Sequence, residues 1–172
     1  MRPRIIDAFP YNNEADILEC RLTELYDAVD AFVLVEADVD HQDHPKPYHY
    51  LENAERFAPW ADKIVPVQAK GLPTLTENPD PWAREHAQRE FIGVGLGVLD
   101  ATAEDIVLQS DVDEIPTALA ARNVRPSGMV AFEHGITVRH RQLRLGLGEG
   151  AASYLASDLT YDYVRINAEY TT

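Results

Sequence analysis

The sequence predicts an α/β fold in which a mainly parallel central sheet is flanked by helices. Short apolar runs alternate with helical patterns along the chain, as in folds built from strand–helix–strand units. The run at 31–35 is apolar at every position, which is typical of a parallel strand that helices cover on both faces. With 172 residues, of which 45% are hydrophobic, the chain can bury one core, so we expect a single domain over 1–172.

The first strand and helix are defined by an apolar run and a repeated leucine spacing. Residues 5–9 predict a short strand, and the loop after it reaches Asn13, which with Asp16 resembles a helix N-cap arrangement. A helix is expected over 14–26, because leucines recur there at i, i+4 and i+7. These leucines are Leu18, Leu22 and Leu25.

The middle of the chain continues the alternation. After the strand at 31–35 comes a polar, proline-containing loop over 38–48, then a short helical stretch that ends near Phe57. A small strand is expected at 64–67, and the residues from 73 to 81 predict a turn-rich connection.

The next helix and the strand after it lead to the most informative segment. A helix is expected over 82–99, although three glycines weaken its second half: Gly93, Gly95 and Gly97. Residues 105–109 predict a buried strand, and 129–132 and 136–138 predict two more.

An acidic run follows the strand at 105–109 directly, with the sequence Ser110-Asp111-Val112-Asp113-Glu114-Ile115-Pro116. Open α/β sheets bind ligands beyond the carboxyl ends of their strands, which is where Asp111 and Asp113 would lie. Carboxylates one residue apart converge only if the chain turns, and Pro116 favours such a turn. Converged carboxylates suit Mg²⁺ or Mn²⁺, whose other ligands commonly come from substrate phosphates. The alternative is a solvated acidic turn before a helix that begins near Pro116.

Composition narrows the choice of partner. Fifteen basic and 29 acidic residues give a net charge of −14, which repels nucleic acid, so we expect no nucleic-acid binding. An anionic substrate would need a local positive charge, from Lys or Arg or from a metal. Cys20 is the single cysteine, which excludes an intrachain disulfide and a thiolate zinc cage. The sequence shows no signal peptide and no apolar stretch long enough for a membrane span, so we expect a soluble, cytoplasmic protein.

The chain resembles the glycosyltransferase family typified by the bisecting N-acetylglucosaminyltransferase of glycoprotein N-glycans. The matching residues are collinear from 5 to 116 and form a specific ordered set. They are Phe9, Asn13-Glu14, Leu18 to Leu22, Leu25 to Asp30, Phe32 to Glu36, Lys46-Pro47, Arg56-Phe57, Lys63-Ile64, Trp82, Arg84-Glu85, Arg89 and Ser110 to Pro116.

This resemblance implies a single Rossmann-like domain with the type A glycosyltransferase fold. Its nucleotide-sugar-binding part would cover about 1–116, and a shortened acceptor-side part about 117–172. The implied reaction is an inverting transfer of a sugar, N-acetylglucosamine from UDP-N-acetylglucosamine, to an unknown acceptor hydroxyl on a glycan, a protein or a small molecule. Asp111 and Asp113 would hold Mn²⁺ or Mg²⁺, and Asp111 would also contact the donor.

Further donor contacts are expected at the strand ends and on the helix over 82–99. Glu36, at the end of the second strand, would accept hydrogen bonds from the base or ribose of the donor. Asn13 and Glu14 are read either as a helix cap or as donor contacts. Arg89 would reach the diphosphate, although with Glu85 it also forms an ordinary i, i+4 pair.

Lys46, in the polar loop, and Arg84, on the helix, are two further candidate donor contacts. Lys46 is a plausible phosphate partner, but a solvated lysine is the ordinary alternative. Arg84 is too far from Arg89 along the helix to share one narrow stripe with it.

The general base that an inverting transfer needs is not identified by any motif. Glu133, after the predicted strand at 129–132, is a candidate, with Asp158 and Asp162 as alternatives. His134 or His140 would be a third metal ligand.

Two other functions remain open from the sequence. One is a non-catalytic nucleotide-sugar-binding module, which the short stretch after the acidic run favours. The other is a phosphotransferase or phosphatase with an aspartyl nucleophile, because those enzymes also place two aspartates after a strand. Their motif normally lies near the start of the domain, unlike this one.

Overall fold

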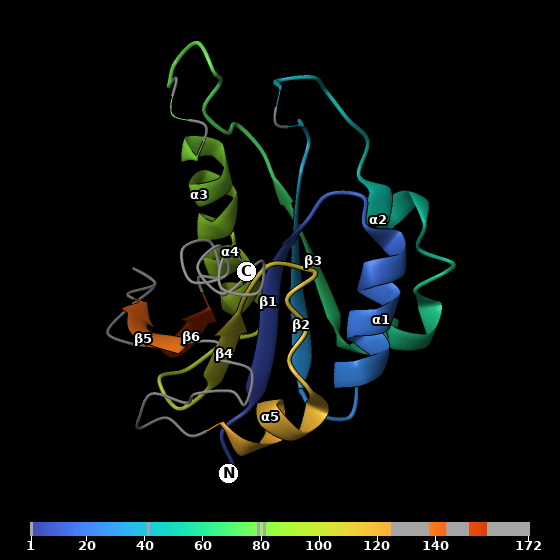
Figure 1. The fold of residues 1–172 in the computed structure, drawn as a ribbon, viewed down its shortest axis with the longest axis vertical. Helices are drawn as coiled ribbons and strands as arrows, with labels where there is room; N and C mark the ends of the chain where they lie inside the picture. Colours follow the sequence, from blue (N-terminus) through green and yellow to red (C-terminus); the bar gives the residue numbers. More distant parts are fainter. Residues whose placement is uncertain are drawn as a thin grey trace, which may run out of the picture.

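The computed structural model describes residues 2–40, 42–78, 80, 82–124, 138–143 and 152–157, the last two segments as backbone. The strands are β1 (Ile5–Tyr11), β2 (Ala31–Ala37), β3 (Ile64–Ala69), β4 (Ile106–Gln109), β5 (Val138–Leu143) and β6 (Ala152–Ser157), shown in Figure 1. The helices are α1 (Ala15–Leu25), α2 (His49–Glu52), α3 (Ala83–Glu90), α4 (Ile92–Val98), α5 (Ala118–Asn123) and the 3₁₀ helix η1 (Ala58–Lys63).

The described strands form one sheet in the order β3-β2-β1-β4-β6-β5. All neighbouring pairs are parallel except β5 and β6, which are antiparallel. The expectation of an α/β fold with a mainly parallel sheet is therefore confirmed. The chain adds β2 and β3 on one side of β1 and then returns to place β4 on the other side. Ligands of such sheets bind where the strand order reverses, which here is between the carboxyl ends of β1 and β4.

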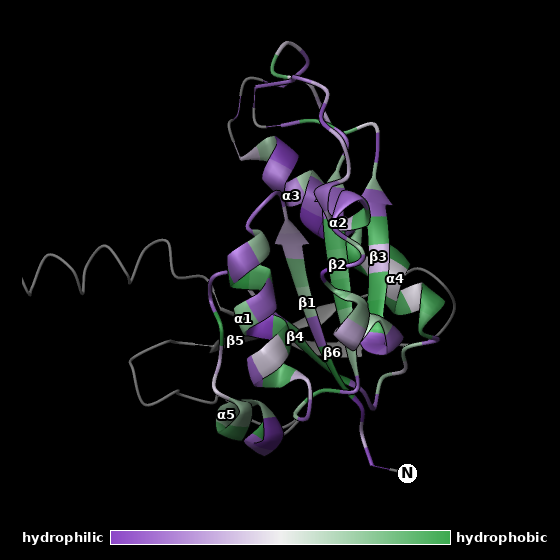
Figure 2. Ribbon diagram, turned by 90° about the vertical axis from the view of Figure 1, so that its right-hand side faces the viewer, coloured by the Kyte–Doolittle hydropathy of each residue, from purple (hydrophilic) through white to green (hydrophobic). Residues whose placement is uncertain are grey.

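Helices cover both faces of the sheet, so its strands separate two apolar cores (Figure 2). On one face, α1 packs through Leu18, Leu22 and Leu25, which are fully buried as the leucine spacing predicts. On the other face, α4 packs through Ile92 and Leu96. Because both faces are covered, every residue of β2 is buried, as the run of apolar residues predicts.

The helix expected over 82–99 is instead two helices that meet at Phe91. Gly95 lies on the side of α4 that faces the sheet, and a Cβ atom there would clash with the side chain of Val33 in β2. Gly95, one of the glycines that weaken the helical pattern, therefore allows α4 to lie close on the sheet.

The expected N-cap at Asn13 is wrong by one residue, because the residue that precedes α1 is Glu14 and its side chain makes no cap hydrogen bond. The Glu14 carboxylate instead accepts hydrogen bonds from the amides of Asn12 and Asn13, both at 3.0 Å. The Glu14 side chain thus stabilises the loop that follows β1. The strand expected at 129–132 lies outside the described residues, as do residues 136 and 137, whereas Val138 begins β5.

Candidate functional site

The acidic run forms a turn at the carboxyl end of β4, as its sequence predicts. The amide of Glu114 donates to the Asp111 carbonyl at 3.0 Å, and the amide of Ile115 to the Asp113 carbonyl at 3.1 Å. Val112 is buried in the core, whereas Asp113 is exposed and the Asp111 side chain is 41% exposed. The buried valine anchors the turn, and the flanking carboxylates remain accessible.

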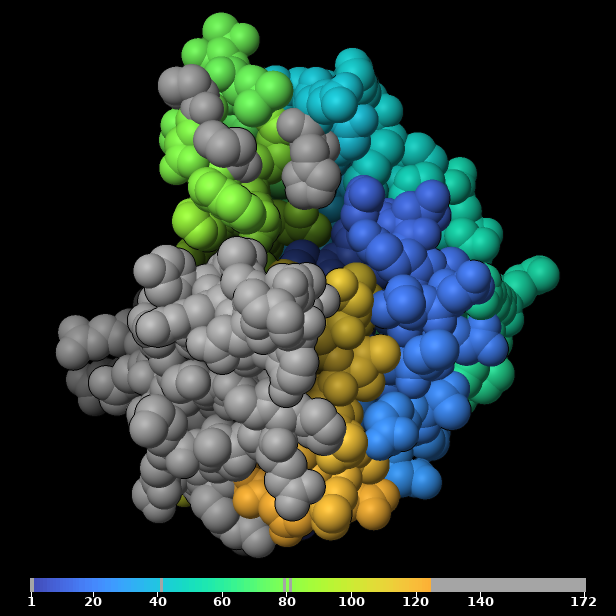
Figure 3. Space-filling view, viewed as in Figure 1, coloured from blue at the N-terminus to red at the C-terminus, as the bar shows by residue number. Residues whose placement is uncertain are grey.

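Helix α3 brings a cation to this turn. The Arg89 guanidinium lies 2.5 Å from Asp111 Oδ1 and 2.7 Å from Glu85 Oε1. Gln88, the preceding residue of α3, donates to the Val35 carbonyl of β2 at 2.8 Å, which holds the helix over the sheet edge. In the space-filling view, the dark blue of β1 lies deeper than the green surface of α3 and the blue surface of the residues after β1 (Figure 3).

A buried ion pair lies beneath the acidic turn. Arg21 of α1 and Asp7 of β1 both have fully buried side chains, and the guanidinium binds both carboxylate oxygens, at 2.7 and 2.8 Å. The guanidinium carbon also lies 4.5 Å from the centre of the Phe9 ring. This bidentate geometry is the one in which a buried pair best offsets the cost of removing its charges from water.

The same arginine binds the backbone of the turn. One of its terminal nitrogens donates to the carbonyls of Asp111 at 2.6 Å, Val112 at 3.2 Å and Glu114 at 3.2 Å. The other donates to the Ser110 hydroxyl at 2.7 Å. Arg21 thereby joins β1, α1 and the acidic turn.

Sequence reasoning did not assign a site role to this pair, although a signal for it is present. Asp7 interrupts an apolar strand, and Arg21 lies on the leucine face of α1, between Leu18 and Leu22. A single acid in a core strand and a single base on a core helix face indicate a buried pair, because each needs a partner there.

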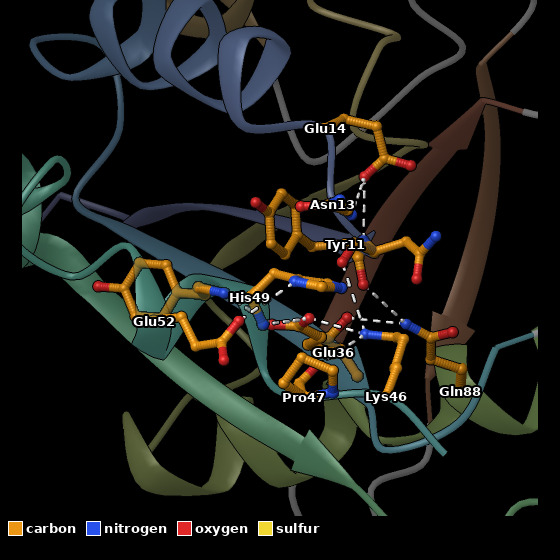
Figure 4. A network of polar contacts seen from close by, with 12 residues as sticks. Tyr11, Asn13, Glu14, Glu36, Lys46, Pro47, His49, Glu52 and Gln88 are labelled. Atoms are coloured by element: carbon orange, nitrogen blue, oxygen red, sulfur yellow. Dashed lines mark hydrogen bonds and ion pairs between the residues drawn. The ribbon is translucent and has the colours of Figure 1, made fainter. Parts of the chain in front are cut away.

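Glu36 and Lys46 form a second polar centre, drawn in Figure 4. Glu36 is 2% exposed, and its Oε1 accepts from Lys46 Nζ at 2.7 Å and from the His49 amide at 2.8 Å. Its Oε2 accepts from the Tyr50 amide at 3.0 Å. The two residues expected to contact the donor therefore bind each other, and Glu36 holds the first amides of α2.

Tyr11 adds a buried phenol next to this centre. Burial, and then the carboxylates of Glu36 and Glu14, raise the pKa of Tyr11 to about 12. Its hydroxyl is buried without a hydrogen-bond partner among the described residues. Asn13 and Glu14, also expected to contact the donor, are exposed at the end of β1.

Arg84 lies apart from both centres. It is buried, donates to the carbonyls of Pro73 and Asp40, and pairs with the Asp43 carboxylate. These contacts tie the loop after β2 to the loop after β3. Arg84 therefore holds these two loops together, and its contact with the donor stays a prediction.

The remaining candidates are not placed by the structure. Glu133, His134, Asp158 and Asp162 lie outside the described residues, and His140 belongs to β5, which is described as backbone. Among residues whose side chains are described, no group of three or more His, Cys, Asp or Glu is arranged to hold a metal ion.

Comparison with known proteins identifies the family. The model of Glycosyltransferase family 17 matches residues 1–128, which contain β1 to β4, the acidic turn and both polar centres. The chain belongs to glycosyltransferase family 17. The resemblance inferred from the ordered sequence motifs is confirmed.

Curated relatives agree with this assignment, and they match a similar length of the chain. The family 17 chain is 30% identical over 118 residues to the human beta-1,4-mannosyl-glycoprotein 4-beta-N-acetylglucosaminyltransferase, covering 66% of the chain and 22% of that enzyme. The enzyme of Rattus norvegicus gives the same identity and coverage. The match thus spans less than a quarter of these relatives.

Other comparisons add little to the family 17 assignment. A segment of the chain is 67% identical to the glutamate N-acetyltransferase of Methanosarcina mazei over 30 residues, which are 17% of this chain and 8% of that enzyme. So short a match carries neither a fold nor an activity to this chain. No solved structure matches significantly. Within the described residues, no helix has the length and apolar character needed to cross a membrane.

Proposed function

We propose that this family 17 domain binds a nucleotide sugar at the carboxyl ends of β1 and β4 and transfers the sugar to an acceptor hydroxyl with inversion. The proposed donor is UDP-N-acetylglucosamine, and the proposed fold is that of type A glycosyltransferases. The observation that carries the proposal is that Arg89 and the acidic turn meet at the point where the strand order reverses. In a family 17 chain, this is the expected place for a donor diphosphate.

The chemistry of the acidic turn fits a divalent cation. Asp111 and Asp113 provide two accessible hard oxygen ligands on one tight turn, the number that Mg²⁺ or Mn²⁺ commonly takes from protein when phosphates complete the shell. When bound, the ion would neutralise charge on the leaving diphosphate. The chain's net charge of −14 makes such a local positive charge necessary for an anionic donor.

The chain's own residues supply orientation. The Arg89 guanidinium presents planar, paired N–H donors that suit phosphate oxygens. The loop after β1 would face the nucleoside, since it lies beside the acidic turn at the edge of adjacent strands. Glu36 and Lys46 would support this loop. Lys46 Nζ donates to the Asn12 carbonyl at 3.5 Å and also to the Glu36 carboxylate at 2.7 Å.

The first test measures thermal stability with UDP, GDP, CMP and UDP-N-acetylglucosamine, each with and without Mn²⁺, in wild type and Asp113→Asn. Saturation at about a hundred times the dissociation constant stabilises by about 2.7 kcal/mol, which is a shift of several degrees. We expect a UDP-selective shift that requires Mn²⁺ and is lost in the variant. Asp113 is exposed, so the variant should unfold at the wild-type temperature without ligand. A variant that responds like wild type contradicts the metal assignment.

A non-catalytic nucleotide-sugar-binding module is the second candidate, because the residues that match the family, 1–128, contain the whole proposed donor site. It predicts the same Mn²⁺-dependent UDP shift with neither hydrolysis of the donor nor transfer to any acceptor. Release of UDP from UDP-N-acetylglucosamine separates the two functions. UDP release that Asp113→Asn abolishes favours the transferase.

A further inference from the structure

Arg21 binds four residues of the acidic turn, and none of these bonds goes to a candidate metal-binding carboxylate. Its bonds go to the Ser110 hydroxyl and to the carbonyls of Asp111, Val112 and Glu114. These groups fix the path of the backbone between the end of β4 and the residues that follow. The directions of the two aspartate side chains follow from that path.

Asp7 determines where Arg21 can place its donors. Both oxygens of Asp7 are bound by Arg21, and both side chains are fully buried. Asp7 lies in the centre of β1, paired in register with Leu108 of β4. Arg21 therefore holds the acidic turn at a fixed position relative to Asp7, inside the sheet.

The charges of the pair cancel, so its effect on the turn is mainly one of geometry. A lysine would retain the charge at position 21, but its compact ammonium lacks the planar fork that serves a carboxylate and several carbonyls at once. The function of the pair thus depends on the guanidinium shape, and not only on a buried positive charge.

We propose that Arg21, held by Asp7, is a positioning residue that pre-forms the Ser110–Glu114 turn for divalent-cation binding. This rests on the proposed function, in which Asp111 and Asp113 bind the metal. Supporting groups of this kind commonly change metal affinity by about 10- to 100-fold when removed. Without the pair, the turn would have to be ordered by the metal itself.

The deciding variant is the double replacement Asp7→Leu/Arg21→Met. Breaking one partner leaves a buried charge, whereas replacing both by apolar residues of similar volume often preserves stability. We expect a folded protein in which the affinity for Mn²⁺ in the presence of UDP, measured by titration calorimetry, falls at least about tenfold. We also expect the amides of Glu114 and Ile115 to exchange at least about tenfold faster without metal, because the turn that protects them is no longer held.

Two further variants separate positioning from stability. Arg4→Met removes a different ion pair, the one with Asp105 at the amino-terminal ends of β1 and β4. It should leave unchanged both the affinity for Mn²⁺ and the amide exchange rates of the turn. Ser110→Ala removes one bond from Arg21 to the turn, and with it the bond that the Ser110 hydroxyl donates to the Glu114 carbonyl at 3.1 Å, without touching the pair. It should weaken Mn²⁺ binding by a smaller factor of about three.

The outcomes distinguish this inference from the proposed function. If wild type binds no Mn²⁺, the proposed function fails, while the exchange rates still test whether Arg21 holds the turn. Wild-type exchange and Mn²⁺ affinity in the folded double variant would overturn the inference. If the double variant does not fold, unchanged affinity and exchange in Ser110→Ala would overturn it.

Discussion

At the scale of single residues, the ion pair between Arg89 and Asp111 places a guanidinium where a metal would bind. The two groups lie 2.5 Å apart, and neither is fully buried. A cation on Asp111 would compete with Arg89, and a displaced guanidinium would be free to bind donor phosphate. The same residue would then oppose metal binding alone and favour binding of metal with donor.

Arg89→Gln should therefore have effects of opposite sign on two ligands. Affinity for Mn²⁺ alone should rise about two- to fivefold, as expected from the loss of a partly exposed ion pair. Affinity for UDP with Mn²⁺ should fall about tenfold or more, because a charged donor to phosphate is lost. Titration calorimetry measures both constants.

Glu85→Gln is the matched control on the same helix. It removes the other carboxylate that binds Arg89, at 2.7 Å, and leaves Asp111 as the partner. Affinity for Mn²⁺ alone should then stay close to the wild-type value. A fall in Glu85→Gln as large as the rise in Arg89→Gln would mean that overall charge, and not release of Asp111, controls metal binding.

At the scale of elements, α4 packs closely on the sheet and directly follows α3, the helix that carries Arg89. Gly95 of α4 lies against Val33 of β2 and Val67 of β3. The pair of helices follows the sheet surface only because no side chain intervenes at this position.

Gly95→Ala should destabilise the protein by about 1–2 kcal/mol, although alanine favours a helix, because overpacking a closed core usually costs about 1–3 kcal/mol. Chemical denaturation followed by circular dichroism measures the change. Val98→Ala, at a residue of α4 that is 68% exposed, is the control and should change stability by less than about 0.5 kcal/mol. Equal effects at both positions would contradict the packing explanation.

At the scale of the whole molecule, ion pairs join segments that are far apart in the sequence. Arg4, before β1, binds Asp105, before β4, at 2.6 Å. Although burial raises the pKa of the Asp105 carboxyl, hydrogen bonds from Arg4 and from the Thr102 amide outweigh it, so the pKa lies below its ordinary value. This pair secures the amino-terminal edge of the strands whose carboxyl ends carry the site.

The lowered pKa of Asp105 predicts how acid affects the fold. A carboxyl whose pKa is lower in the folded state stabilises the fold fully above its unfolded pKa of about 3.9, and this contribution is lost as pH falls through the folded value. Asp105→Asn should therefore lose stability relative to wild type at pH 7, and the difference should shrink below about pH 4. Urea denaturation at a series of pH values measures it, and a difference that grows with acid would contradict the assignment.

Several features of this chain could be predicted from local sequence. The apolar run of β2, the leucine face of α1 and the acidic turn after β4 are patterns of neighbouring residues, and the structure confirms each of them. The family could also be recognised, because the order of its motifs is carried by the sequence itself. Local patterns suffice here because strand, helix and turn preferences act between residues close in the chain.

Only the tertiary structure decided which polar residues meet. Arg89 reaches Asp111 from 22 positions away and Arg21 reaches the same turn from 90, distances over which no spacing rule applies. Glu36 and Lys46, expected to face the donor, bind each other, since an acid buried at a strand end needs a nearby cation and amides. The sequence by itself determined the family, the fold class and the position of the acidic turn. The partners of its charged side chains depended on how the strands and helices pack, because packing alone brings such distant residues within bonding distance.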